Sequence, residues 1–281
     1  MLTVHVASDL HFRGDPARNS GAYQVLADIW KCFDPTTDYL VVTGDITSDG
    51  EDDQIAEAVK ALWSFKDRLL LCPGNHDYGP LGNLYQEETA RRFDDVLLRK
   101  LGLDKVQSGP AGFYSKRVVP RVLHDGAGIR VLALGLNSNL KTKNPTDFAQ
   151  GELGPVQIAE LRGMLLDPQY AGMWVLVYLH HRPQYLGPIM ELGFGMHDAE
   201  DFIAAVTGRA QVVVFGHTGG ALRPKDDGWR LKDTGITPHR DGVPDLVNAN
   251  QCVEMREHYA ITFETPWTAG AYPAVVLHHP S

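Results

Sequence analysis

The sequence predicts a layered α/β fold built on mixed β-sheets. Short apolar runs recur along the chain, and each is followed by a loop rich in Gly, Asp or His. Segments with the apolar spacing of amphipathic helices lie between these runs, and this alternation is typical of helices packed on sheets. Residues 112–136 and the segment after residue 220 have the pattern of β-hairpins, so we expect antiparallel pairs beside the parallel ones.

The N-terminal part of the chain alternates regularly between buried strands and helices. The strands are predicted at Leu2–Ala7, Tyr39–Thr43 and Leu69–Cys72. Helices are predicted from apolar residues three or four positions apart, at Gly21–Phe33, Asp52–Leu62 and Glu87–Lys100. Acidic residues in the first turn of the second helix agree with this, because the helix dipole favours negative charge there.

The remainder is predicted to complete a single domain of residues 1–281. The hairpin segment ends in the apolar run Ile129–Leu136, and residues 137–154 form a loop rich in Asn, Gly and Pro. Further elements are predicted at Pro155–Leu166 and Asp198–Val206 as helices, and at Met173–Leu179, Gln211–Phe215 and Tyr259–Phe263 as strands. Residues 220–281 are expected to be short strands and turns that complete the fold.

Composition excludes several classes of protein. The hydrophobic fraction of 43% is ordinary for a globular domain, and the net charge of −9 argues against binding to nucleic acid or an anionic membrane. No run approaches the roughly 18 apolar residues of a membrane span, and the N-terminus lacks the pattern of a secretory signal. Cys32, Cys72 and Cys252 have no metal-like spacing, so we expect buried free thiols in a reducing, cytoplasmic setting.

Five predicted strands end in loops with the residue types of a metal site. These loops contain Asp9 and His11, Gly44-Asp45, Gly74-Asn75-His76-Asp77, His180-His181-Arg182-Pro183, and Gly216-His217. Ligand sites in α/β sheets lie beyond the carboxyl ends of strands, so the loops can converge. Carboxylate, imidazole and amide oxygen suit Mn, Fe or Zn, and the set contains no thiolate. Each motif alone would more simply be a turn or a helix cap.

Together and in this order, the motifs over roughly residues 1–220 resemble those of the calcineurin-like metallophosphoesterases. The resemblance implies a four-layer α/β/β/α sandwich of two mixed β-sheets flanked by helices. It also implies two transition metal ions. Asp9 and His11 match ligands of the first ion, Asp45 matches the carboxylate that bridges both, and the ligands of the second ion match Asn75, His180 and His217.

The implied activity is hydrolysis of phosphate esters. In this family, a hydroxide between two ions about 3.5–4 Å apart attacks phosphorus. His76 matches the histidine that contacts the phosphate and protonates the leaving group. A small-molecule phosphodiesterase or phosphomonoesterase is the leading subclass, because the acidic charge argues against the alternative of an Mre11-like nuclease. The sequence indicates neither the natural substrate nor the oligomeric state.

Two departures from the family pattern leave a third interpretation open. Gly219 stands where many members have a second His, which would leave the first ion with Asp9, His11 and Asp45 only. A scaffold that has lost catalysis is the alternative this departure suggests. Ser48 stands where Asp or Asn is frequent in the family. This departure concerns a residue that contacts the metal ligands and is not itself a ligand.

Several neighbours of the motifs allow two roles each. Asp77 could orient His76 by accepting its ring proton, or could cap the following turn. His181 is expected to pack behind the ligands, and Arg182 to be a solvated surface residue or a phosphate clamp. Asn137 is a candidate pocket residue. The other histidines, His5 and His258 among them, have no spacing that singles them out.

Overall fold

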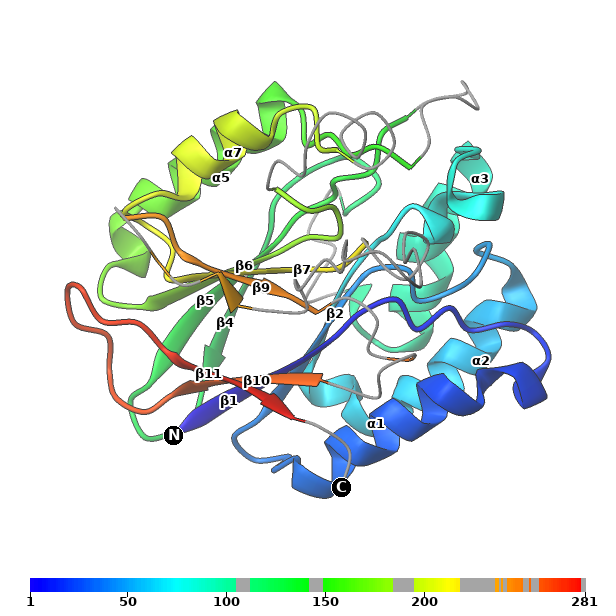
Figure 1. Ribbon diagram of the computed structural model, residues 1–281, viewed down its shortest axis with the longest axis horizontal. Helices are drawn as coiled ribbons and strands as arrows, with labels where there is room; N and C mark the ends of the chain where they lie inside the picture. Colours follow the sequence, from blue (N-terminus) through cyan, green and yellow to red (C-terminus); the bar gives the residue numbers. More distant parts are fainter. Residues whose placement is uncertain are drawn as a thin grey trace, which may run out of the picture.

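The protein is a four-layer α/β/β/α sandwich, as the sequence predicts. The computed structural model describes residues 1–104, 112–141, 149–183, 195–217, 236–237, 239, 242–249, 253 and 258–278. Within these residues, a sheet of five strands and a sheet of six strands lie face to face. Helices cover the outer side of each sheet (Figure 1). None of the described helices is long and apolar enough to cross a membrane.

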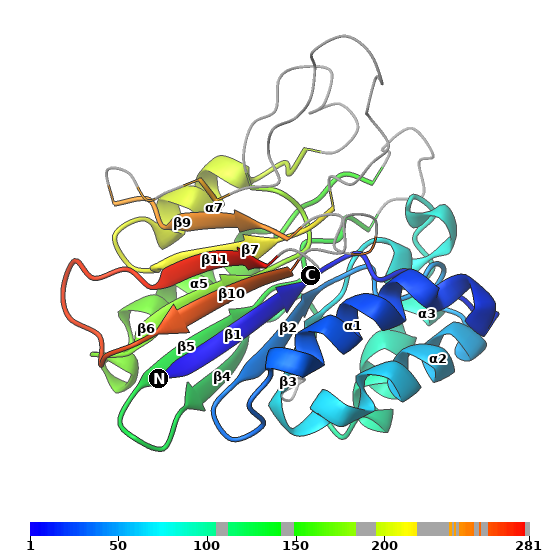
Figure 2. The same ribbon diagram turned by 60° about the horizontal axis from the view of Figure 1, so that its bottom comes forward.

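The first sheet has the strand order β11-β10-β1-β2-β3. Its strands are β1 (Leu2–Ala7), β2 (Tyr39–Thr43), β3 (Leu69–Cys72), β10 (His258–Phe263) and β11 (Ala274–His278). The first three are parallel, and β10 runs antiparallel to β1. Two helices connect the parallel strands, namely α1 (Ser20–Cys32) and α2 (Asp52–Leu62). Both lie on the same side of this sheet (Figure 2).

The second sheet has the order β4-β5-β6-β7-β9-β8. Its strands are β4 (Val119–His124), β5 (Arg130–Gly135), β6 (Trp174–Tyr178), β7 (Val212–Phe215), β8 (Ile236–Thr237) and β9 (Asp245–Asn248). Strands β5, β6, β7 and β9 are parallel, whereas β4 and β8 are antiparallel to their neighbours. The covering helices are α5 (Pro155–Leu166) and α7 (Ala199–Val206). The predicted mixture of parallel and antiparallel pairs is confirmed.

Alternation along the central strands divides the core into two regions. Val131 and Ala133 of β5 belong to the apolar cluster that includes side chains of the first sheet. Leu132 and Leu134 point to the opposite face and pack with side chains of α5 and α7. A strand that is apolar on both faces therefore reads as a continuous apolar run, which is why these strands were visible in the sequence.

Most predicted bounds agree with the structure within one residue, but the predicted helix Glu87–Lys100 differs in kind. It begins as α3 (Glu87–Arg92) and continues as a π-helical turn at Phe93–Leu98. Short 3₁₀ turns occur at Pro16–Asn19, Trp63–Arg68, His76–Tyr78, Pro80–Gly82 and Pro168–Tyr170. In the C-terminal part, β8 and β9 join the second sheet while β10 and β11 join the first.

The π-helical turn contains a half-buried carboxylate, that of Asp94, which makes stability depend on pH. Burial raises the pKa of Asp94 to about 6, although the amides of Phe113 and Tyr114 donate to it. Because the folded-state pKa lies above the ordinary value of 3.8, the stabilisation is present below about pH 4 and is lost as pH rises to about 6. We expect wild type to lose about 1–2 kcal/mol relative to Asp94→Asn between pH 4 and pH 7. Urea unfolding at both pH values measures this, and an unchanged difference would contradict it.

Candidate metal centre

The loops after β1, β2, β3, β6 and β7 meet at one place, as expected for parallel strands that end at the same edge. Backbone hydrogen bonds align the first two loops, from Asp9 N to Gly44 O at 3.1 Å and from His11 N to Asp45 O at 2.9 Å. The main chain of His217 donates to Asp9 Oδ2 at 3.3 Å. The second sheet thus brings its loops onto those of the first.

Asp45 lies at the centre of the site, and its two carboxylate oxygens face different groups. Oδ2 is 3.7 Å from His11 Nε2, whereas Oδ1 is 3.3 Å from His180 Nε2. The amide of His76 also donates to Oδ1, at 3.0 Å. Two sets of potential ligands therefore share Asp45, one with His11 and His76 and the other with His180 and His217.

His180 connects the two sheets within the site. Its Nδ1 donates to the Thr43 carbonyl at 2.7 Å, and its Nε2 is 2.9 Å from Asn75 Oδ1 and 3.1 Å from His217 Nδ1. Burial opposes protonation of His180, but the Asp45 carboxylate outweighs it and raises the pKa to about 9. The point where these nitrogens and oxygens meet therefore favours a positive charge.

The two acidic residues of the site, Asp9 and Asp45, also favour a positive charge beside them. Burial raises the pKa of Asp9, and the effect is partly offset by His180. Burial opposes ionisation of Asp45 as well, yet His180 and His76 hold its pKa well below the usual range. A buried carboxylate such as Asp45, with the acidic Asp9 as a neighbour that raises the cost of its charge, needs cationic partners. The donor set of carboxylate, imidazole and amide oxygen fits Mn, Fe or Zn in that role.

The backbone around these ligands is strained and closely packed. Asp9, His11, Asp45 and His217 all have positive φ, between 46° and 76°. This region is unfavourable for residues other than glycine, and such strain is typical of functional sites. Neighbouring glycines leave room for the ligands. A Cβ at Gly44 would lie 2.6 Å from His180 Nδ1, and a Cβ at Gly216 would lie 2.6 Å from Asp9 Oδ2.

The hydrogen bonds of Asp77 among the described residues do not include the ring of His76, so the orienting role, one of the two predicted for it, gains no support. The Nδ1 of His76 donates instead to the backbone carbonyl of Ser48, at 2.8 Å. The buried Asp77 carboxylate accepts from the amides of Ile46, Thr47 and Gly74 and from the Thr47 hydroxyl. It therefore fastens the loop after β2 to the loop after β3, which sets Asp45 beside its neighbours.

The other residues near the motifs also have defined places. Asn137 is buried and donates to Tyr78 Oη and the Phe113 carbonyl, so it supports the site from behind. His181 packs its ring 4.3 Å from that of His217, as predicted. Arg182 is buried against the Phe215 ring rather than solvated. Gly219 lies outside the described residues.

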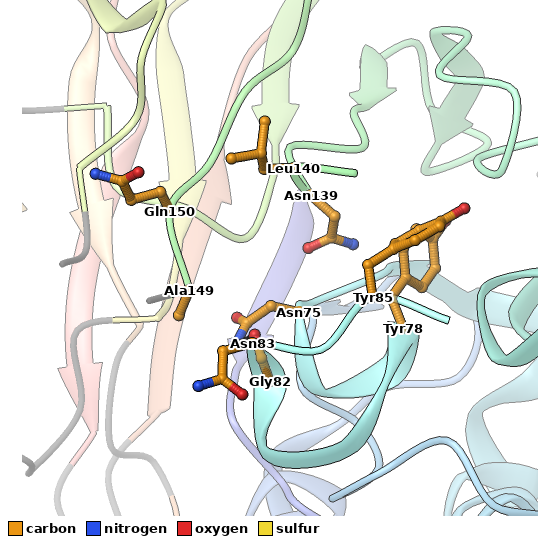
Figure 3. Close-up of a pocket in the computed structure, with 9 residues that line it drawn as sticks. All are labelled: Asn75, Tyr78, Gly82, Asn83, Tyr85, Asn139, Leu140, Ala149 and Gln150. Carbon is orange, nitrogen blue, oxygen red and sulfur yellow. Dashed lines mark hydrogen bonds between the residues drawn. The ribbon is translucent and has the colours of Figure 1, made fainter. Parts of the chain in front are cut away.

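A pocket that sequence reasoning did not resolve opens beside Asn75. It has a volume of about 290 Å³ including its mouth. Figure 3 shows Asn75, Asn83 and Asn139 between Gln150 on one side and the tyrosines on the other. Asn139 is buried, and neither polar atom of its amide has a hydrogen-bond partner among the described residues. It lies in the loop that follows β5, so the strand-end rule, which pointed to Asn137 in the same loop, could have been extended to it.

Comparison with known proteins agrees with this geometry. A family model described as calcineurin-like phosphoesterase matches residues 2–220. No curated protein matches the sequence. A dimetal phosphatase from Danio rerio is structurally similar, with a TM-score of 0.60, 11% identity and 92% of both chains covered. A Haemophilus influenzae NAD nucleotidase has a TM-score of 0.54 at 13% identity, with 99% of this chain and 50% of that chain covered. At these identities the likeness shows a shared fold.

The contacts of Asp77 predict that it acts on metal affinity rather than on chemistry. In Asp77→Asn, an amide nitrogen must face backbone N–H donors, so the variant should lose about 1–3 kcal/mol of stability. Metal affinity should fall about 10–100-fold, as is usual for groups that position ligands. At saturating metal, kcat should stay within a few-fold of wild type.

Isothermal titration with Mn²⁺ and kinetics at saturating Mn²⁺ measure these effects. Asp94→Asn is the matched control, because Asp94 also accepts backbone amides but lies in the π-helical turn. It should leave metal affinity unchanged. A large fall in kcat for Asp77→Asn at saturating metal would return Asp77 to a role in the reaction.

Proposed function

The chain belongs to the calcineurin-like phosphoesterases, and from this premise we propose that it hydrolyses phosphate esters of small molecules with two bound metal ions. The observation that carries the proposal is the position of Asp45, whose oxygens face His11 on one side and His180 on the other. A carboxylate placed in this way can hold two cations close together.

The proposed ligands divide between the two ions. The first ion would be held by Asp9, His11 and Asp45, and the second by Asp45, Asn75, His180 and His217. When bound, two ions of Mn, Fe or Zn supply a nucleophilic hydroxide at neutral pH and neutralise charge on the phosphoryl oxygens. The chain contributes the fixed geometry, because Asp45, His180 and His217 are buried and the loops of the site are tied by backbone hydrogen bonds.

His76 is the proposed general acid. Since its Nδ1 donates to the Ser48 carbonyl, the other ring nitrogen, Nε2, is left to exchange a proton with the substrate. A Cβ at Gly82 would lie 2.7 Å from that nitrogen, so the glycine keeps the approach to it open. The ring also packs edge-on against His11, with 4.7 Å between centroids. This places the proton donor beside the first group of ligands.

The pocket beside Asn75 is the proposed site for the organic part of the ester. Its lining is rich in amide side chains, and the buried amide of Asn139 offers N–H donors and an acceptor oxygen that have no other partner among the described residues. Lys141 lies over the Tyr85 ring at 5.8 Å and adds positive charge near the mouth. These features support a small polar substrate over a nucleic acid strand, for which a basic groove would be required.

Assays on an aryl phosphate monoester, an aryl phosphate diester and single-stranded DNA test the proposal directly. With Mn²⁺ present, we expect turnover of at least one aryl phosphate and little cleavage of DNA. Preferential cleavage of DNA would favour the nuclease alternative. Metal binding without turnover of any of the three would favour the silent scaffold. A screen of phosphorylated metabolites would then narrow the substrate.

Replacement of the shared carboxylate should remove most of the activity without unfolding the protein. In Asp45→Asn, a neutral amide cannot offset two cations, so we expect kcat on aryl phosphate to fall by at least about 100-fold. Asp67→Asn makes the same chemical change at a side chain that is 84% exposed, and it should behave as wild type. Near wild-type kcat in folded Asp45→Asn would exclude the bridging role.

The role of His76 can be tested by varying the leaving group. His76→Ala should keep its metal content while kcat falls by about 10²–10⁴-fold, and the fall should be larger for esters with poor leaving groups. The exposed His124→Ala is the control and should leave kcat unchanged. An equal loss across leaving groups would mean that His76 positions the phosphate and transfers no proton.

A further inference from the structure

A second cluster of histidine and cysteine lies on the outer face of the first sheet, where helix α1 packs against β1 and β10. His5 of β1 pairs with Ala260 of β10, so His258, two residues earlier on β10, shares its face. His258 in turn pairs with His278 of β11. The C-terminal end of α1 lies against this face (Figure 1) and ends with Cys32. The sheet register thus gathers residues that are far apart in the sequence.

Three of these side chains are close enough to share one ion. The ligand atoms of His5, Cys32 and His258 lie within 4.8 Å of one another, and the Cys32 sulfur is 3.9 Å from His258 Nε2. None of the three belongs to the metal centre described above. Both histidines are buried, whereas Cys32 is exposed, in contrast to the buried thiol that the sequence suggested. The cluster is therefore closed on the sheet side and reachable from solvent.

The contacts of His5 point to a ligand. Its Nε2 lies 3.3 Å from Asp38 Oδ2, and that carboxylate also accepts from the amide of Asp34 at 2.9 Å. The other ring nitrogen, Nδ1, is buried and has no hydrogen-bond partner among the described residues. A buried polar atom without a partner is costly. A histidine that gives one nitrogen to a carboxylate and keeps the other free has the usual arrangement of a zinc ligand.

We propose that His5, Cys32 and His258 form a Zn²⁺ site that fastens the end of α1 to β1 and β10. Two imidazoles and one thiolate are donors that Zn²⁺ prefers, with water in the fourth position. The site is structural, since it holds a helix end on the face of the sheet opposite the second sheet. Its position at the C-terminal end of α1 also suits a cation, because the helix dipole is negative there.

The separation of the Cys32 and His258 ligand atoms is close to that of two atoms bound to one ion. Tetrahedral bonds of about 2.3 Å to sulfur and about 2.0–2.1 Å to nitrogen separate these atoms by about 3.6 Å. The observed separation of 3.9 Å between Cys32 and His258 is close to that value. The ring of His258 is held in place by parallel stacking on His278, at 4.9 Å and 4°. Burial also lowers the pKa of His258 to about 4, so its imidazole is neutral and can bind a cation.

Cobalt spectroscopy can distinguish this site from the first. Co²⁺ replaces Zn²⁺, and a thiolate bound to Co²⁺ gives a charge-transfer band in the near ultraviolet that imidazole and carboxylate ligands do not give. The proposed phosphoesterase centre has no thiolate, so a thiolate band reports only the second cluster. We expect the band in Co²⁺-loaded wild type and also in Asp45→Asn, because the two sites share no ligand.

Matched variants decide the outcome. Cys32→Ser and His258→Gln should each abolish the band, whereas Cys252→Ser and His124→Gln should keep it. Zn²⁺ should raise the Tm of Asp45→Asn, and the rise should disappear when Cys32→Ser is added. Absence of the band in wild-type protein loaded with Co²⁺, or its survival in Cys32→Ser, would overturn the proposal. Cys32 is exposed, so its replacement is compatible with a folded chain.

Discussion

The carboxylate of Asp45 is the constraint on which the rest of this site depends. It is buried, it sits between two sets of ligands, and it cannot be buried as an anion without positive charge and hydrogen-bond donors around it. The amide of His76 and the ring of His180 meet part of that need. Both come from other strand ends, so the two sheets must meet with their carboxyl edges together. The arrangement of the strand ends in the sandwich thus meets the requirements of this one charge.

The same constraint explains why the loops are strained. Asp9, His11 and Asp45 can aim their side chains inward only from turns with positive φ, a conformation that most residues avoid. Rigid surroundings compensate for it. Backbone bonds run between the loops after β1 and β2, and Asp77 fastens the loop after β2 to that after β3. The positive φ values of Asp9, His11 and Asp45 lower the stability of the fold, and the hydrogen bonds between the loops offset this loss. Asp77, which makes several of these bonds, is too buried to touch a substrate.

Features that leave a local pattern in the sequence could be predicted from it, whereas contacts between distant segments could not. Strands buried on both faces appear as apolar runs, so β1, β2 and β3 were predicted with their observed bounds. The candidate ligands follow strand ends, so the convergence of these side chains was predicted as well. The role of Asp77 was not, because its partners are backbone amides of another loop and leave no pattern in side chains. Arg182 looked like a surface residue, since sequence alone does not reveal that it is buried with its guanidinium group over the Phe215 ring.

The histidine and cysteine cluster shows the limit of motif analysis most clearly. A motif is visible when its residues are near one another in sequence or follow a common structural signal. His5 lies within β1, near the start of the chain. Its partner strand β10 begins at His258, near the end of the chain. Only the antiparallel register of β1 with β10 places both rings on one face. Register follows from the burial of each strand's apolar face, so it is encoded across the whole sheet and not in any local spacing. A metal site that depends on register therefore emerges only once the strands are paired, whereas a site at strand ends can be predicted before that.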